Sequence, residues 1–451
     1  MSSFDPPTKL LPWHSINPRP LAPLQRHPEP PILPSLPSPP RPPAFSHLYT
    51  LSTHIIPAAY PRVTADVPEP GRVPDTGIDR EERNRIGNQR AAEILDAKCR
   101  QSNGGPMEGS RKLLWNCINR YARNDMNGQK GLTLFFAHAN GFPKEIWEPS
   151  LQHMLSDPSV PRIDEIWTWE ATQHGDSALI NRVNLSGIYD WMDNSRDILN
   201  FLINYLPSAA IPSVLPVHLP RLPEDESESR KVKGYQDRIL AAVGHSFGGC
   251  TVSLVAINYP ALFSSIVLVD PIISVPGFYE KSPEGLPNYL KGALLRREHW
   301  PTREEALRLF KKVPFFAVWD PEVLQIYVDH GLAPDPKGGF RLKMSGVQEA
   351  LAFAEFRVPY EVWELIDRLD EKIELRWVMP GHQGSFTSSV PSKPYSDEDS
   401  MRVKVWRRPK NASNIRIPNA GHLIPHELPR AFAQDLLGFL QQKYGTQQAK
   451  L

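Results

Sequence analysis

The chain has 451 residues, 40% of them hydrophobic, which predicts one large domain with insertions or two ordinary domains. Its formal net charge of +1 at pH 7 argues against a nucleic-acid partner and against binding to an acidic membrane surface. The three cysteines, Cys99, Cys117 and Cys250, form neither a disulfide framework nor a metal-ligand pattern, so we expect a reducing compartment, no metal and no cofactor.

Proline is concentrated at the start of the chain, where it makes up 15 of the first 45 residues. Such a stretch lacks backbone donors and apolar mass, so residues 1–45 are predicted to be an extended, polyproline-like and poorly ordered leader. The leader has no apolar run that resembles a signal peptide. No segment approaches the ~18 consecutive apolar residues of a membrane helix.

After the leader, strand and helix patterns alternate, which predicts an α/β fold with a mostly parallel central sheet and helices on both faces. The core is expected over 46–275 and 358–446, with surface insertions at about 71–109 and 207–234. Strands are predicted at 48–56, 132–137, 163–170, 238–243, 265–269, 373–378 and 414–417. Helices are predicted at 189–205, 251–259, 360–369 and 427–444. Residues 276–357 interrupt the alternation with helical, aromatic-rich sequence and are predicted to form a lid.

Ser246 stands in Gly244-His245-Ser246-Phe247-Gly248-Gly249, between the strand at 238–243 and the helix at 251–259. A nucleophilic serine needs its hydroxyl at the carboxyl end of a strand, on a turn so tight that its neighbours must be small. Ser246 is therefore the candidate nucleophile, and the alternative is an idle serine in a glycine-rich turn. His245 is expected to pack or to form a hydrogen bond inside this turn.

The general base is expected on the loop after the last strand, where Gly421 precedes His422. An imidazole with an ordinary pKa of about 6.5 can take the proton of the serine and return it to the leaving group. His422 is therefore the candidate base. Its competitor is His426, four residues later, which we interpret as a surface residue that points away from the site.

The acid is less obvious, because the usual place after the strand at 373–378 has no carboxylate between Met379 and Ser385. Asp270 follows the strand at 265–269 and is the candidate acid, since both strands end at the same edge of the sheet. The alternative role for Asp270 is to cap the turn before Pro271. Asp397 and Glu398 are further candidates, in a polar loop that is a poor place from which to orient an imidazole.

A serine hydrolase also needs hydrogen-bond donors for the oxyanion that develops on the attacked carbonyl. The backbone N–H groups of Phe247 and of Asn140, in the loop His138-Ala139-Asn140-Gly141-Phe142, are the candidate donors. His138 is expected to support this loop and to lie against the substrate. Asp176 is expected to be structural.

With these motifs the chain resembles a family of fungal peroxisomal α/β-hydrolases, which includes lipases, toxin-biosynthesis hydrolases and acyl-CoA hydrolases. The resemblance runs from about residue 46 to the end and rests most on residues 138–145, 244–249, 269–271 and 421–423. It implies the α/β-hydrolase fold with a helical lid insertion, and a catalytic triad of Ser246, Asp270 and His422. It also implies substrates that are esters or CoA thioesters of apolar acids.

The tail, residues 447–451, contains Ala449-Lys450-Leu451, a variant of a peroxisomal targeting tripeptide. Members of the family end in such a tripeptide, so the resemblance supports this interpretation. We therefore expect a peroxisomal import receptor as partner and the peroxisomal matrix as location. A homodimer is left open.

The leading functional hypothesis is a serine hydrolase that cleaves an acyl-CoA thioester or a related ester in peroxisomal lipid or secondary-metabolite metabolism. Trp300, Phe316 and Trp319 of the lid would bind the acyl part. The basic residues near the lid either bind the phosphates of CoA or form an ordinary solvated face: Arg296, Arg297, Arg303, Lys311 and Lys312. One alternative is a lipase or esterase for neutral lipids, and another is a ligand-binding protein with a vestigial hydrolase pocket.

Overall fold

The computed structural model describes residues 2–45, 48–74, 77–103, 108–126, 130–212, 214–275, 286–382 and 396–445. The tripeptide Ala449-Lys450-Leu451 lies outside these ranges. Within them, no helix is both long enough and apolar enough to cross a membrane.

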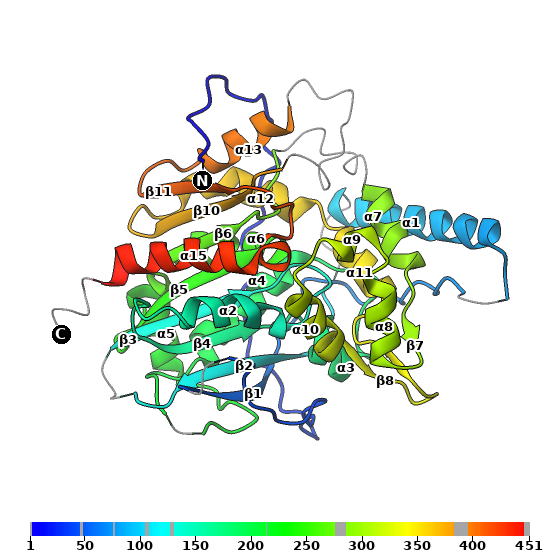
Figure 1. Cartoon of the computed structure of the whole chain (residues 1–451), viewed down its shortest axis with the longest axis horizontal. Coiled ribbons are helices and arrows are strands. Elements are labelled where there is room, and N and C mark those ends of the chain that lie inside the picture. Colours follow the sequence, from blue (N-terminus) through cyan, green and yellow to red (C-terminus); the bar gives the residue numbers. More distant parts are fainter. Residues whose placement is uncertain are drawn as a thin grey trace.

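The core of the molecule is an eight-stranded sheet with the strand order β1-β2-β4-β3-β5-β6-β10-β11 (Figure 1). β2 is antiparallel to both of its neighbours, and all pairs from β4 to β11 are parallel. This confirms the predicted mostly parallel sheet. The strands are β1 (Tyr49–Pro57), β2 (Trp115–Arg123), β3 (Gly131–Ala137), β4 (Ile163–Trp169), β5 (Arg238–His245), β6 (Ser265–Val269), β10 (Glu374–Pro380) and β11 (Ala412–Ile417).

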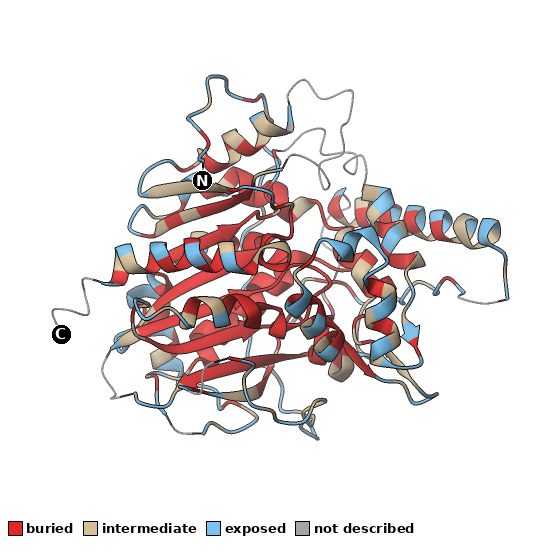
Figure 2. Ribbon diagram, viewed as in Figure 1, coloured by how far each residue is buried: buried red, intermediate tan, exposed pale blue. Residues whose placement is uncertain are grey.

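The central strands are apolar along their whole length because both faces of the sheet are covered. Successive side chains of a strand point to opposite faces, and in β3 Phe135 joins one hydrophobic cluster whereas Leu134 and Phe136 join another. The buried interior between the helices is shown in Figure 2. Continuous apolar runs rather than alternating ones are therefore the pattern that this sheet requires.

Helices pack on both faces of the sheet, as predicted. α4 and α6 belong to the first cluster, and α2 and α15 belong to the second and pack against each other. The core helices are α2 (Glu148–Leu155), α3 (Gly175–Asn181), α4 (Trp191–Asn200), which continues as a π-helical turn at Phe201–Tyr205, α6 (Phe247–Asn258), α12 (Arg357–Leu365), α13 (Asp397–Val405), α14 (Ile424–Glu427) and α15 (Pro429–Leu440).

The lid is helical, as expected, but it also contains a small antiparallel sheet of order β7-β9-β8. These strands have two or three residues each, too short for a sequence pattern to reveal. Residues 276–285 of the lid lie outside the described ranges. The lid elements are α7 (Leu286–Leu295), β7 (His299–Trp300), α8 (Arg303–Phe310), α9 (Pro314–Ala317), α10 (Pro321–Gly331), β8 (Leu332–Pro334), β9 (Phe340–Leu342) and α11 (Gly346–Phe353).

The two insertions each contribute a helix. α1 (Arg80–Asn103) comes from the insertion at 71–109 and packs against α7 of the lid. α5 (Glu224–Lys233) comes from the insertion at 207–234 and packs beside the π-helical turn that follows α4. The first insertion is therefore part of the support of the lid.

The proline-rich leader differs from the poorly ordered segment that its composition suggested. It is extended and has no helix, but Phe4 and Leu11 are buried. The N–H of Phe4 donates to the side-chain oxygen of Asn414, 2.6 Å away, and Arg19 forms ion pairs with Asp190 and Glu361. These few anchors hold a chain that proline has already made stiff, so that less conformational entropy is lost when it docks.

Candidate active site

Ser246 occupies the turn between β5 and α6, with a φ of 54° and a ψ of −114°. Such a positive φ is unusual for a residue with a side chain and is typical of a nucleophile on a strand-to-helix turn. A Cβ at Gly248 would lie 2.3 Å from the carbonyl oxygen of Ala137, and one at Gly244 would lie 2.6 Å from the Cα of Gly249. The glycines are required because the backbone segments are this close.

The structure brings the three predicted triad residues together. The Nε2 of His422 lies 2.8 Å from the Oγ of Ser246, and its Nδ1 lies 2.7 Å from the Oδ2 of Asp270. The Nδ1–H of the imidazole can therefore donate to the carboxylate while Nε2 accepts from the hydroxyl. This arrangement fits a serine nucleophile, a general base and an orienting acid.

Asp270 sits directly after β6 with a φ of 32°, and its N–H donates to the carbonyl of Val378 on β10, 2.9 Å away. Burial by itself would raise the pKa of this carboxyl, but the neighbouring charges of Lys404 and His422 outweigh it and lower the pKa to about 2. The ammonium of Lys404 lies 3.5 Å from Oδ1. Asp270 is therefore ionised at neutral pH, as an orienting acid must be.

A hydrogen bond from His245 holds the loop that carries His422. The Nε2 of His245 lies 2.9 Å from the carbonyl oxygen of His422. Burial lowers the pKa of His245 to about 3, so the ring is neutral and donates its Nε2–H to that carbonyl. The carboxylate of Glu427 accepts from the N–H of Gly421 at 2.6 Å. His245 thus supports the loop of the candidate base, in agreement with its expected role.

The alternative candidates for the acid and for the base lie in other environments. Glu398 pairs with Arg402 and Arg416, and the side chain of Asp397 lies outside the described part of the chain. His426 corrects the sequence interpretation: it is fully buried rather than at the surface. The reason is tertiary, because α14 lies beneath the lid and Trp319 covers it, with ring centroids 4.8 Å apart.

The loop with the candidate oxyanion donors lies against the start of α6. The N–H of Gly248 donates to the carbonyl of His138 at 3.1 Å. Phe247 is the first residue of α6, where an N–H group has no acceptor within the helix. The side chain of Asn140 is held from both sides, by His174 at 3.0 Å and by the carbonyl of Glu349 in the lid at 3.3 Å.

His138 supports this loop, and its geometry argues against the expected contact with substrate. Its Nδ1–H donates to the carbonyl of Ala139 at 2.8 Å, and its Nε2 accepts from the N–H of Ala171 at 3.1 Å. Burial lowers the pKa of His138 to about 4, so the ring is neutral and both of its nitrogens are engaged with the backbone.

His174 is a residue that sequence reasoning did not assign. Burial holds its pKa well below the usual value, so its Nε2–H donates to the side-chain oxygen of Asn140. A signal was present, since His138 follows β3 and His174 follows β4, and these strands are parallel neighbours. Residues at the carboxyl ends of adjacent parallel strands lie at the same edge of the sheet.

A buried cluster of charged side chains connects the lid to the segment that follows the candidate oxyanion loop at residues 138–142. The ammonium of Lys144 lies 2.8 Å from Asp176 and 3.0 Å from Glu145. Lys343 of the lid lies 2.6 Å from the other oxygen of Asp176, and the hydroxyl of Ser38 in the leader donates to that oxygen at 2.7 Å. Asp176 is thus structural, as expected, and it joins core, lid and leader.

The lid aromatics divide into two groups. Trp319 packs on Phe142 of the oxyanion loop, with ring centroids 5.3 Å apart, and on Phe316, with ring centroids 5.0 Å apart. Trp300 packs on Phe310 at 5.0 Å, one ring further out. Trp319 and Phe316 therefore lie beside the oxyanion loop, and Trp300 lies on the far side of Phe310, which packs on Phe316.

The basic residues of the lid differ in whether other groups of the lid bind them or solvent surrounds them. Arg296 pairs with Glu349, Arg303 donates to carbonyl groups of the lid, and Arg297 donates to the carbonyl of His299. Lys311 and Lys312 are exposed. Arg297 is exposed as well, so these three residues match the solvated face that the sequence suggested, whereas Arg296 and Arg303 are half-buried.

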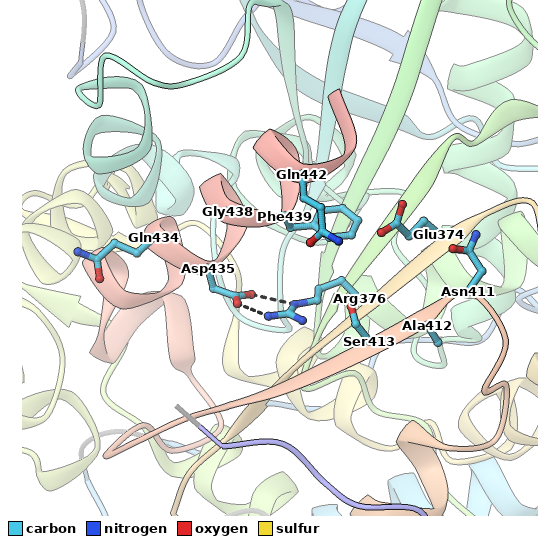
Figure 3. A pocket seen from close by; sticks show the side chains of 10 residues that line it. All are labelled: Glu374, Arg376, Asn411, Ala412, Ser413, Gln434, Asp435, Gly438, Phe439 and Gln442. Carbon is cyan, nitrogen blue, oxygen red and sulfur yellow. Dashed lines mark hydrogen bonds and ion pairs between the residues drawn. The ribbon is translucent and has the colours of Figure 1, made fainter. Parts of the chain in front are cut away.

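The side chain of Ser246 is closed off, with 6% of the residue exposed. A hollow of about 570 Å³ (Figure 3) lies instead between α15 and the amino ends of β10 and β11. The triad lies at the opposite, carboxyl end of the parallel strands, so this hollow does not serve it. Among the described residues, no group of His, Cys, Asp and Glu side chains could hold a metal ion.

Known proteins show what the chain is similar to. It is 29% identical over 203 residues to the type I acyl-CoA thioesterase mpaH of Penicillium brevicompactum, which is 44% of this chain and 39% of that protein. It is 25% identical over 239 residues to the peroxisomal membrane protein LPX1 of Saccharomyces cerevisiae, 49% of this chain and 55% of that protein. The matches therefore span about half or less of the length of these relatives.

The solved structure of the peroxisomal alpha-beta-hydrolase Lpx1 of Saccharomyces cerevisiae shares the fold, with a TM-score of 0.58 at 18% identity over 89% of this chain and 91% of that chain. The alpha/beta hydrolase family matches residues 134–435, a range that includes Ser246, Asp270 and His422. The resemblance drawn from the motifs is confirmed, and the chain belongs to the alpha/beta hydrolase family.

Proposed function

We propose that this protein is a serine hydrolase that cleaves an acyl-CoA thioester, or a related ester, of an apolar acid. The observation that carries the proposal is the continuous series Asp270, His422 and Ser246, with contacts of 2.7 and 2.8 Å. The similarity to an acyl-CoA thioesterase over 203 residues supports a CoA thioester as the substrate.

In the proposed reaction, Ser246 Oγ attacks the acyl carbonyl while His422 takes the proton of the hydroxyl. The N–H groups of Phe247 and Asn140 stabilise the oxyanion. The bond from carbonyl carbon to sulfur then breaks, and His422 gives its proton to the leaving thiolate of CoA. Water, deprotonated by His422, attacks the acyl-enzyme, and the free acid leaves as Ser246 regains its proton.

The lid supplies the environment for the two parts of the substrate. Phe316 and Trp319 form an apolar surface beside the oxyanion loop, which suits an apolar acyl group. Lys311 and Lys312 are exposed on the lid and can meet the phosphates of CoA.

A second candidate is an esterase or lipase for neutral esters. The observation that favours it is that two of the five basic residues near the lid, Arg296 and Arg303, are half-buried and engaged by groups of the lid itself. A phosphate-free ester does not need these charges. A double variant Lys311→Ala/Lys312→Ala separates the candidates: it should raise KM for acyl-CoA but leave KM for a nitrophenyl ester unchanged.

The reaction is tested by free-thiol release from a panel of acyl-CoA thioesters. The wild-type chain should turn over at least one of them, and Ser246→Ala should abolish turnover. Asp270→Asn should lower kcat by about four orders of magnitude, because the imidazole loses its orienting acid. A fully active Asp270→Asn variant would overturn the acid assignment, and an active Ser246→Ala variant would overturn the reaction.

We further propose the peroxisome as its location, because a relative is named as a peroxisomal protein. A fluorescent fusion that coincides with a peroxisomal matrix marker in fungal cells is the expected result. A uniform cytosolic signal would contradict it.

A further inference from the structure

Lys404, on α13, reaches the end of β6, where the candidate acid lies. Its ammonium is 3.5 Å from the Oδ1 of Asp270 and donates to the carbonyl of Pro271, the next residue, at 3.1 Å. Both charged side chains are largely shielded from solvent, with 11% of Lys404 and 12% of Asp270 exposed. The ammonium therefore contacts both the carboxylate and the backbone of the turn that carries it.

The two oxygens of the Asp270 carboxylate have different partners. Oδ2 lies 2.7 Å from the Nδ1 of His422, and Oδ1 faces Lys404. The terminal torsion of an aspartate has a broad range, so a carboxylate that is held at one oxygen can turn about its last bond. The ammonium beside Oδ1 limits this rotation and leaves Oδ2 for the imidazole.

The backbone of Asp270 also needs support, because its φ is 32°. A residue with a side chain keeps such a conformation only where the surrounding structure imposes it. The N–H of Asp270 donates to the carbonyl of Val378 on β10 at 2.9 Å, and Lys404 binds the carbonyl of Pro271. These two bonds hold the chain immediately before and after the unusual torsion.

Charged or titratable groups face the carboxylate from three elements of the described chain. Lys404 faces it from α13, His422 from the loop after β11, and His245 from β5. Burial lowers the pKa of His245 to about 3, so that ring is neutral. Lys404 therefore supplies a positive charge beside Asp270 and His422, and such a charge disfavours the uptake of a further proton by that pair.

The helix that carries Lys404 packs against the first residues of the leader. Trp406 directly follows α13, and its indole N–H donates to the carbonyl of Phe4 at 2.9 Å. The guanidinium of Arg407 lies over the ring of Trp13, 4.9 Å from its centroid. Phe4 itself is 2% exposed. The carboxyl end of α13, where Lys404 stands, is therefore bound to the leader.

We propose that Lys404 is a positioning residue for Asp270, and that the docked leader holds Lys404 in place through α13. Lys404 acts on the reaction through the carboxylate and not by touching the substrate. The inference rests on the proposed hydrolase function and adds a connection from the first residues of the chain to the active site.

The first test follows how the labelling of Ser246 by a fluorophosphonate depends on pH. The rate constant should fall at low pH, where the pair of Asp270 and His422 takes up a proton. Lys404→Met keeps much of the side chain but removes its charge, so the midpoint of this fall should rise by about one pH unit. Lys404→Arg keeps a permanent cation and should lie within about 0.3 pH units of wild type.

Lys410→Met is the matched control, because it removes an exposed lysine that pairs with Glu371, beyond the end of α13. It should keep the wild-type midpoint. The midpoint does not depend on the amount of folded enzyme, and tryptophan fluorescence at each pH shows that the fold persists. An unchanged midpoint in Lys404→Met, or a shift that Lys404→Arg does not reverse, would overturn the role of Lys404.

The second test asks whether the leader acts through Lys404. The double variant Phe4→Ala/Trp13→Ala removes two leader rings at the end of α13 and should raise the midpoint by about half a pH unit. In the Lys404→Met background the same two changes should add no further shift, because the charge that they displace is already absent. Arg26→Ala, which breaks an exposed pair within the leader, should leave the midpoint unchanged.

An equal shift in the Lys404→Met background would mean that the leader reaches the site by another route. A double variant with the wild-type midpoint would remove the leader from the proposal. Either result contradicts the connection through α13.

Hydrolysis of acyl-CoA thioesters separates this inference from the proposed reaction. Labelling whose midpoint shifts in Lys404→Met supports the positioning role even if no thioester is cleaved, in which case only the proposed substrate fails. Thioester cleavage with the same pH profile in wild type and Lys404→Met leaves the reaction standing and removes the positioning role. A wild-type chain that is neither labelled nor active would overturn both.

Discussion

The neutral imidazoles of His138 and His174 connect the carboxyl ends of β3 and β4 to the candidate oxyanion loop. His138 holds the backbone of that loop through Ala139, and His174 holds the side chain of Asn140. Both pKa values are lowered by burial, so both rings are neutral and hold the loop through hydrogen bonds alone. We therefore expect them to position the candidate oxyanion donors, and we expect no proton transfer through either ring.

Replacing His174 by Ala should lower kcat about tenfold to a hundredfold with little change in KM, because a misplaced donor weakens binding of the transition state more than binding of the substrate. His174→Gln retains an N–H at the end of the side chain and should restore much of the rate. Steady-state kinetics on one thioester measures both effects. His153→Ala, on α2, is the control, and equal kcat values for His174→Ala and wild type would contradict the prediction.

At the scale of elements, the buried strands and the turn at Ser246 were predictable because their causes are local. Strand β5 needs a continuous apolar run, and the turn needs glycine where a Cβ would meet backbone at 2.3 Å. The same local logic placed Asp270 and His422 after β6 and β11. Their distances could not be predicted, since they depend on how the whole sheet twists.

The elements that sequence reasoning missed have tertiary causes. β7 pairs with β9 from a distant segment of the lid, and β8, which is close to β9 in sequence, completes this small sheet. His426 is buried because Trp319 of the lid and Phe142 and His245 of the core surround it, and these residues are distant in the sequence. The leader packs on the core because Arg19 forms ion pairs with carboxylates of other elements.

The lid is attached to the core partly through Lys343, which lies between β9 and α11. Lys343→Met removes its ion pair with Asp176 but leaves that carboxylate paired with Lys144. Loss of about 1 kcal/mol of lid attachment raises the population of open lid about fivefold. A fluorophosphonate should therefore label Ser246 severalfold faster. Lys337→Met, at an exposed lid position, is the control, and an unchanged labelling rate would show that Lys343 does not hold the lid.

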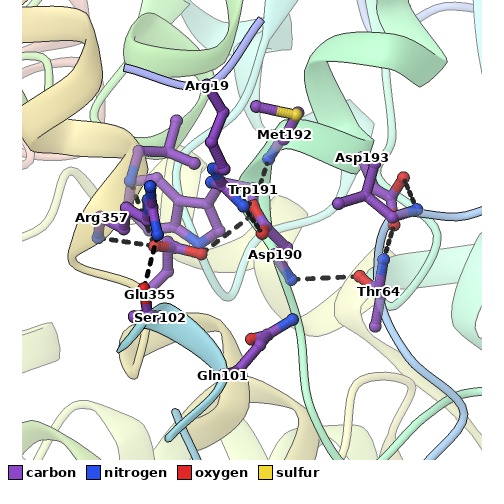
Figure 4. A network of polar contacts seen from close by, with 12 residues as sticks. Arg19, Thr64, Gln101, Ser102, Asp190, Trp191, Met192, Asp193, Glu355 and Arg357 are labelled. Atoms are coloured by element: carbon purple, nitrogen blue, oxygen red, sulfur yellow. Dashed lines mark hydrogen bonds and ion pairs between the residues drawn. The ribbon is translucent and has the colours of Figure 1, made fainter. Parts of the chain in front are cut away.

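At the scale of the whole molecule, the leader ties together parts of the core that are far apart in the sequence. Arg19 bridges Asp190, at the start of α4, and Glu361 on α12, as the polar network in Figure 4 illustrates for Asp190. Those carboxylates are 2% and 1% exposed. Arg19 therefore neutralises charges that the interior cannot solvate.

Arg19→Ala should lower the free energy of unfolding by about 3 kcal/mol, because the buried carboxylate of Asp190 loses its ion pair, whereas Glu361 remains paired with Arg357. Urea unfolding monitored by tryptophan fluorescence gives the value. Arg26→Ala breaks only an exposed pair with Glu29 and should change stability by less than about 1 kcal/mol. Equal midpoints for Arg19→Ala and Arg26→Ala would mean that the leader is not a stabilising part of the fold.

The protein should lose stability steeply in mild acid. Burial lowers the pKa of seven histidines, among them His27. The shift is large for six: to about 4 for His54, His138 and His330, to about 3 for His245, and well below the usual value for His174 and His426. The unfolded chain protonates them below about pH 6.5, whereas the folded chain does not. Their contribution is therefore fully present above pH 6.5 and is lost as the pH falls toward 4.

Urea midpoints at pH 8, 6.5 and 5 measure this loss. In the limit of six extra protons on the unfolded chain, the slope is on the order of 8 kcal/mol per pH unit. His54→Gln, remote from the active site on β1, should make the slope shallower by about one proton. Carboxyl groups whose pKa is raised by burial, such as Glu170 at about 7, reduce the slope. The same slope in wild type and in His54→Gln would therefore contradict a neutral buried ring at His54.

The contacts of the leader also constrain the order in which its parts can pack on the core. Ser38 and Arg41 meet carboxylates at positions 176 and 148, whereas Arg19 meets Glu361 and Phe4 meets Asn414, 342 and 410 residues further along the chain. The residues nearest the core in sequence can therefore dock on the first half of the sheet, and Phe4 can dock only after β11 has joined it.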